Sequence, residues 1–194
     1  TSLMIPKANF GVSIASTTSP SRGSHGASAM AAARVVSSSN SLAIAVAKQL
    51  PQARVTAVDA SAAALAVAQA NAARHAVSVR FLLGDWFAPV EGERFDLILA
   101  NPPYVAEADP HLSQGDVRFE PRSALAAGSE GLDDIRRIVA GAGAHLVPGG
   151  RLYFEHGYDQ ARAVAALLDA AGFVAIAQRR DLAGILRVTG GTRP

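Results

Sequence analysis

The residues that suggest chemistry most directly are Asn101-Pro102-Pro103-Tyr104, which follow the apolar run 95–100. Two prolines stiffen this loop, so the Asn101 side chain and the Pro102 carbonyl are held in one geometry. Their two oxygens can accept both hydrogens of a planar NH2 group, and Tyr104 can pack over its plane. Such a pocket suits a nitrogen nucleophile held near an electrophilic methyl group. The same four residues could also form a plain turn, because Asn-Pro and Pro-Pro both end strands.

Two further polar positions follow apolar runs. Asp59 ends the run 54–59, where a carboxylate can accept both hydroxyls of a ribose or simply cap the next helix. Asp85 and Trp86 follow the run 77–83. Asp85 can accept a hydrogen bond from an adenine amino group while Trp86 walls the ring, or the two can serve as turn and core residues.

Helical and extended patterns alternate along the chain and would position these residues. Helices are expected at 27–34, 42–50, 61–74, 132–146 and 160–171, and strands at 54–59, 77–83, 95–100, 151–155, 173–177 and 185–189. This alternation predicts an α/β fold with a parallel sheet covered on both faces. No helix separates the last two strands, so the last one should be antiparallel. Ligands bind at the carboxyl ends of such strands, where Asp59, Asp85 and Asn101 all fall.

The composition excludes several kinds of site. The chain has no cysteine, which excludes disulfides, thiol catalysis and cysteine-ligated metals. Its five histidines are dispersed without metal-ligand spacing, so no metal is predicted. There is no apolar run of about 18 residues and no signal-peptide pattern, so we expect a cytoplasmic protein without a membrane partner.

Charge is distributed unevenly along the chain. Residues 1–58 carry five basic residues and no acid, whereas residues 59–194 carry 13 basic and 16 acidic residues. Five scattered bases are too few for a nucleic-acid-binding arm, and the remainder is net negative. We therefore expect no direct nucleic-acid partner.

From Leu42 to Gly191 the chain resembles the HemK/PrmC family of class I S-adenosylmethionine-dependent methyltransferases. The matching segments are Ala57-Val58-Asp59, Gly84-Asp85-Trp86, 95–104, Val117-Arg118-Phe119-Glu120-Pro121-Arg122-Ser123-Ala124-Leu125, Pro148-Gly149-Gly150 and 179–184. Asn-Pro-Pro-Tyr alone does not separate glutamine from adenine methyltransferases, but the segment 117–125 favours the group that acts on release factors. The resemblance implies a Rossmann-like, mostly parallel seven-stranded sheet with an antiparallel last strand and helices on both faces.

The resemblance also implies a reaction and a set of residues. The family methylates the side-chain amide nitrogen of the glutamine in the Gly-Gly-Gln motif of class 1 peptide chain release factors. Its cofactor is S-adenosyl-L-methionine, and the product is S-adenosyl-L-homocysteine. By this similarity the catalytic residues are Asn101, Pro102 and Tyr104; the substrate-binding residues are Asn101, Pro102, Pro103, Tyr104 and Glu120; and the cofactor-binding residues are Asp59, Asp85, Trp86 and Asn101. Asp59 would hold the ribose, and Asp85 with Trp86 would contact adenine.

The chain departs from the family after the expected first strand. The family has an Asp-x-Gly-x-Gly-x-Gly loop there, whereas residues 35–41 read Val-Val-Ser-Ser-Ser-Asn-Ser, without glycine or acid. We therefore divide the chain into an atypical segment, 1–41, in place of the interdomain hairpin, first strand and glycine loop, and a methyltransferase domain, 42–194. The helical domain that usually precedes the catalytic domain is not recognisable, which is expected of a truncated form.

Three alternatives stay open at this point, two that explain the departure and one that concerns the substrate. A reading frame shifted between Lys7 and Leu42 would explain the family-like flanks, the lack of acids and the excess of serine, and resequencing the coding DNA tests it. A catalytically impaired fragment with a degenerate cofactor loop is a second interpretation. The third is an adenine N6-methyltransferase acting on nucleic acid, which would need a basic groove that the net negative residues 59–194 do not suggest.

Overall fold

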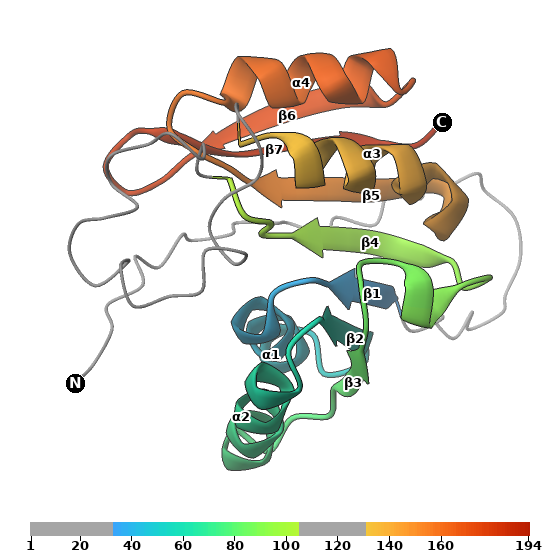
Figure 1. The fold of residues 1–194 in the computed structure, drawn as a ribbon, viewed down its shortest axis with the longest axis vertical. Coiled ribbons are helices and arrows are strands. Elements are labelled where there is room, and N and C mark those ends of the chain that lie inside the picture. The colour runs from blue at the N-terminus through green and yellow to red at the C-terminus, as the bar shows by residue number, and fades with distance from the viewer. Residues whose placement is uncertain (1–32, 105–130) are drawn as a thin grey trace, which may run out of the picture.

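The computed structural model describes residues 33–104 and 131–194, which build one sheet with helices around it (Figure 1). The strands are β1 Arg34–Ser37, β2 Arg54–Asp59, β3 Arg80–Leu83, β4 Phe95–Ala100, β5 Leu146–Glu155, β6 Val174–Arg180 and β7 Leu186–Thr192. The helices are α1 Asn40–Gln49, α2 Ala62–Arg74, the short 3-10 helix η1 Ala88–Val90, α3 Asp133–His145 and α4 Ala161–Ala170.

The strand order is β3-β2-β1-β4-β5-β7-β6. Neighbours from β3 to β5 pair in parallel, and β7 runs antiparallel to both β5 and β6. The expected seven-stranded, mostly parallel sheet with an antiparallel last strand is therefore confirmed. The order reverses between β1 and β4, and in open α/β sheets ligands bind at the carboxyl ends of strands beside such a reversal.

The central strands of the sheet are covered on both faces, because their side chains alternate between two buried apolar clusters. Val35 of β1 packs in a cluster with Ala43 and Ala47 of α1. The next residue, Val36, belongs to the cluster that contains the apolar faces of α3 and α4. The core of β1 and β4 is thus apolar on both sides, and their polar groups are left at the strand ends.

The helix termini follow local rules. Ser61 caps α2, because its side chain accepts a hydrogen bond from Ala64 N. Asp133 and Asp134 lie in the first turn of α3, where negative charge is favourable to the helix dipole. Within the described residues, no helix is long and apolar enough to cross a membrane.

Some expected boundaries were wrong. Arg34 begins β1, so the helix expected over 27–34 does not reach it; residues 27–32 lie outside the described ranges. β3 begins at Arg80 rather than at residue 77. β5 begins at Leu146 rather than Arg151, because Gly149 N donates to Arg193 O and Arg193 N donates to Gly150 O, which continues the pairing past the glycines.

The atypical segment is partly described. Residues 33–41 contain all of β1 and the start of α1, so the chain forms a first strand and a turn within the segment that we set apart. The division at residue 41 stays a prediction.

Candidate active site

The turn between β1 and α1 is held by its own serines. Ser37 Oγ lies 3.1 Å from both the backbone N and the carbonyl oxygen of Ser39. Ser38 N donates to Leu99 O, and Ser38 Oγ accepts a hydrogen bond from Asn101 N at 3.2 Å. This turn therefore contacts the end of β4 directly beside Asn101.

Asp59 ends β2 next to the first residue of α1. Its Oδ2 accepts from Asn40 Nδ2 at 2.6 Å, and its Oδ1 accepts from Ser61 N at 2.8 Å. Asn40 Oδ1 is buried and has no hydrogen-bond partner among the residues that the structure describes. Such an atom is costly unless a donor reaches it. Asn40 and Asp59 thus form a polar pair with one unused acceptor.

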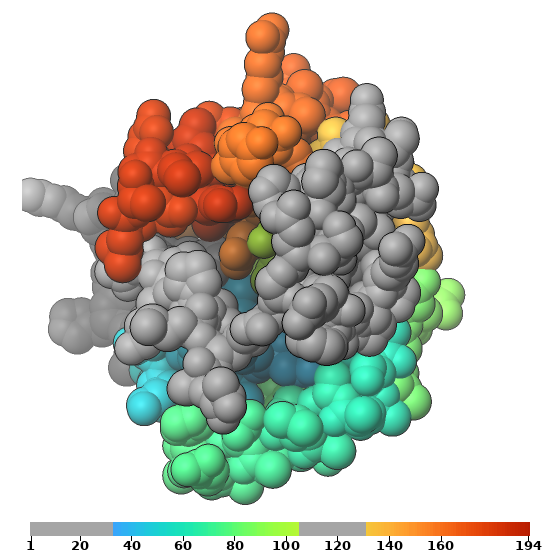
Figure 2. Space-filling model, turned by 60° about the vertical axis from the view of Figure 1, so that its left-hand side comes forward, coloured from blue at the N-terminus to red at the C-terminus, as the bar shows by residue number. Residues whose placement is uncertain are grey.

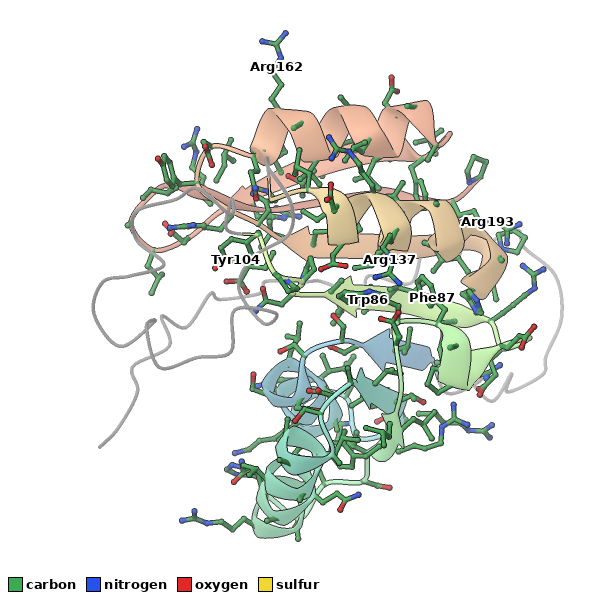
Figure 3. The ribbon with its side chains drawn as sticks, viewed as in Figure 1. Trp86, Phe87, Tyr104, Arg137, Arg162 and Arg193 are labelled. Carbon is green, nitrogen blue, oxygen red and sulfur yellow. The ribbon has the colours of Figure 1, made fainter. Side chains whose placement is uncertain are left out.

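Asp85 and Trp86 follow β3 closely, and Gly84 N donates to Asp59 O at 3.1 Å. Trp86 is half-buried against the core and has a φ of +44°, which is uncommon for a bulky residue. The exposed carboxylate of Asp85 accepts from Arg137 Nη2 at 2.6 Å. This hydrogen bond is the main reason that the pKa of Arg137 is raised. Figure 3 labels Arg137 on α3 and Trp86 in the segment after β3, the two elements that this ion pair joins.

Asn101-Pro102-Pro103-Tyr104 continue directly from β4. Asn101 is exposed, Pro102 is buried, and the other two residues are half-buried. The main-chain carbonyl of Tyr104 accepts a hydrogen bond from Gln160 Nε2 at 2.9 Å. Figure 3 shows Tyr104 at the end of β4, whereas Arg193 lies at the opposite end of the sheet.

Two buried polar residues beside Tyr104 were missed by the sequence analysis. Gln160 precedes α4, and its Oε1 accepts from Gly157 N at 2.8 Å. His156 follows β5 and is fully buried, with Nδ1 2.8 Å from Gly157 O and Nε2 2.8 Å from Thr189 Oγ1. Burial lowers the pKa of His156, so the ring is more readily neutral. The sequence signal that could have indicated them is the polar run 156–160, which lies between an apolar strand and a helix.

The structure brings most of the predicted positions to one edge of the sheet. Asp59 ends β2, Asp85 follows β3 and Asn101 follows β4. Hydrogen bonds through Gly84, Asn40 and the turn after β1 link these three strand ends. Figure 2 looks toward this edge, with α2 in green on one side and the C-terminal strands in red on the other. Glu120 lies outside the described residues. Within the described ranges, no three His, Asp or Glu residues are placed to hold a metal ion.

Known proteins resemble this chain in sequence. The family model "Methyltransferase small domain" matches residues 37–117, from the end of β1 past Tyr104. A release factor glutamine methyltransferase of Xylella fastidiosa is 54% identical over 157 residues, covering 80% of this chain and 57% of that protein. The corresponding protein of Bordetella pertussis is 53% identical over 154 residues, covering 79% of this chain and 57% of that protein. The chain belongs to the release factor glutamine methyltransferase family. It spans little more than half the length of these family members.

Solved structures support the fold of this family. A methyltransferase from Pyrococcus furiosus superimposes with a TM-score of 0.61 at 16% identity, covering 84% of this chain and 75% of that one. The N-methyltransferase NodS from Bradyrhizobium japonicum, solved with S-adenosyl-L-homocysteine, gives 0.55 at 19% identity, covering 84% and 79%. At these identities the likeness concerns the fold alone: a class I methyltransferase sheet.

Proposed function

We propose that this chain is the catalytic part of a protein-(glutamine-N5) methyltransferase acting on class 1 release factors in the cytoplasm. The observation that carries the proposal is about 50% identity to relatives named for that activity, across a region that contains Asn101-Pro102-Pro103-Tyr104. The relatives from Xylella fastidiosa and Bordetella pertussis are named for glutamine methylation of release factors, which favours a glutamine substrate over a nucleic-acid base.

The proposed roles follow from the end of β4. The Asn101 side-chain oxygen and the Pro102 carbonyl accept the two amide hydrogens of the substrate glutamine, and Tyr104 packs beside the amide. The ring of Pro102 is buried, which fixes this loop and so orients the nitrogen for attack. As the nitrogen takes up the methyl group, it loses one proton to water.

The residues beside Asp59 fit the ribose part of S-adenosyl-L-methionine. The Asp59 carboxylate accepts one hydrogen bond at each oxygen and retains lone pairs for hydroxyl groups. The buried Asn40 Oδ1 is a further acceptor, which a hydroxyl or amino donor would satisfy. When bound, the cofactor supplies an electrophilic methyl group on a sulfonium centre. Asp85 with Trp86 would flank the adenine.

The turn after β1 is the part of the proposed site that differs from the family pattern. Ser37 Oγ bonds the Ser39 backbone, so this turn is closed by side chains where the family has glycines. Glycines there let the backbone approach a ligand closely. We therefore expect cofactor binding that is weaker than a glycine-rich loop would give.

Calorimetry of the full chain with S-adenosyl-L-methionine, followed by mass spectrometry of a release factor incubated with both, tests the function. We expect binding in the micromolar range and one methyl group on the Gly-Gly-Gln glutamine. A release factor in which that glutamine is replaced by alanine is the matched control. Absence of binding heat would instead support the impaired-fragment interpretation.

A further inference from the structure

Gln160 bonds the main chain at two positions that are far apart in sequence. Its Nε2 donates to Tyr104 O at 2.9 Å and to Gly131 O at 3.3 Å. These two carbonyls are 27 residues apart in sequence, yet one amide group bonds both. Gln160 itself is only 8% exposed, and its bond to Gly131 O is buried while its bond to Tyr104 O is partly buried.

Gly131 has a backbone conformation and a lack of side chain that permit this contact. It has a φ of +67°, in the left-handed region that favours glycine. A Cβ at this position would collide with the Tyr104 carbonyl and would lie 2.8 Å from Gln160 Nε2. The close approach of residues 104 and 131 therefore requires a residue without a side chain.

The oxygen of the Gln160 amide is also held by a hydrogen bond. Its Oε1 accepts from Gly157 N, and Gly157 O lies 2.8 Å from His156 Nδ1. His156 Nε2 in turn contacts Thr189 Oγ1 of β7. Because Gly157 N is a donor, the amide must present its oxygen there, and its NH2 group is directed to the two carbonyls.

We propose that Gln160 is a positioning residue for the substrate amide, and this inference rests on the proposed function. It fixes the main chain at Tyr104, three residues after Asn101, against the end of β5. A loose Tyr104 would let the two acceptors at Asn101 and Pro102 drift from the geometry that orients the nitrogen. Misplacement by about 1 Å costs on the order of 100-fold in rate.

The variant Gln160→Glu tests this role. It keeps an acceptor for Gly157 N but sets a carboxylate oxygen against two carbonyl oxygens at neutral pH. We expect kcat/KM for the release factor to fall by about 10- to 100-fold, with the affinity for S-adenosyl-L-methionine unchanged. At lower pH the buried carboxyl becomes protonated and regains a donor, so its rate relative to the unmodified chain should recover.

Gln178→Glu is the matched control. Gln178 Nε2 donates to Ala161 O at 2.8 Å, so this glutamine also bonds a backbone carbonyl at the start of α4. An equal loss of kcat/KM in both variants would show that the rate depends on the start of α4 and not on the Tyr104 carbonyl. That result would overturn the inference. We expect Gln178→Glu to leave kcat/KM unchanged.

A second readout does not depend on activity. The sequence contains one Tyr-Val pair, Tyr104-Val105, so carbonyl-13C tyrosine with 15N valine gives a single triple-resonance NMR signal for the Tyr104 carbonyl. Loss of the hydrogen bond should move this carbon upfield in Gln160→Glu at neutral pH, and not in Gln178→Glu. If Gln160→Glu fails to fold, Gln160→Met removes the same bonds without burying a charge and should show the same shift at every pH.

The two proposals fail in different ways. An unmodified chain that transfers no methyl group overturns the proposed function, and the carbonyl signal then decides whether Gln160 holds Tyr104. An unchanged signal in Gln160→Met, which has no donor at any pH, overturns the inference. So does an unchanged kcat/KM for Gln160→Glu when the unmodified chain is active.

Discussion

The two sides of the candidate site are built differently. On the substrate side, a part-buried hydrogen bond ties Tyr104 to Gln160, and two buried hydrogen bonds through Gly157 continue to His156. On the cofactor side, the turn after β1 satisfies itself with serine side chains, and Asn40 has a buried oxygen without a partner among the described residues. The polar groups on the substrate side bond to one another, whereas Asn40 Oδ1 on the cofactor side is available to a donor from a ligand.

This contrast indicates whether the serine-rich residues 35–41 affect substrate positioning or cofactor affinity more strongly. Buried polar networks with every member bonded rigidify a site, whereas an orphaned acceptor costs free energy until a ligand supplies a donor. We infer that the substrate side is pre-organised and that cofactor affinity is the property most affected by the serine-rich turn.

The largest expected effect separates the two sides directly. Asn101→Ala removes one of two acceptors for the substrate amide, so methylation should fall by about 100-fold or more. The Asn101 backbone N still bonds Ser38 Oγ, so we expect affinity for S-adenosyl-L-methionine to change only slightly. Paired calorimetry and rate measurements check this. A comparable loss of cofactor affinity would show that the two sides are not separable at this residue.

A smaller effect is expected from repairing the turn. Replacing Ser37–Ser41 with a glycine-rich loop removes the Ser37 Oγ contacts and lets the backbone approach the cofactor. We expect affinity for S-adenosyl-L-methionine to rise by about tenfold, with release factor affinity unchanged. Calorimetry measures both. If affinity does not rise, the turn is not the defect, and the contrast between the two sides loses its explanation.

The elements that could be predicted were those set by local pattern. The strand bounds 54–59 and 95–100 match β2 and β4, because each is a short, mainly apolar stretch with a polar residue at its end or directly after it. The start of β5 could not be found, since Pro148 and the two glycines after it read as a helix stop and a turn. They belong to a strand because Arg193, far along the chain, pairs with them.

In the candidate site, too, the residues that could be predicted were those with a local sequence signal. Asp59 and Asn101 stand at strand ends, where the fold class predicts ligands, and the structure places both at one edge. Gln160 carries no such signal, because its partners are backbone carbonyls 56 and 29 residues away, and any residue type offers a carbonyl. Asn40 was missed for a different reason: it lies in a serine-rich stretch that reads as a loop, and only the start of α1 places it against Asp59.

The smallest expected effect concerns the buried end of the substrate side. The pKa of His156 is lowered from its ordinary value of 6.5 because burial disfavours the charged ring, and Arg187 lowers it further. Between the lowered pKa and 6.5 the unfolded chain binds a proton that the folded chain does not, so stability falls as pH drops through that range. Urea unfolding from about pH 7.5 to about pH 5.5 should therefore show a falling free energy of unfolding, with a weaker slope in His156→Gln. Glu155 acts in the opposite sense, since burial raises its pKa above 4.5 and its contribution is lost as pH rises. An unchanged slope in His156→Gln would mean that the network behind Gln160 is open to water, and the substrate side would then be no more rigid than the turn after β1.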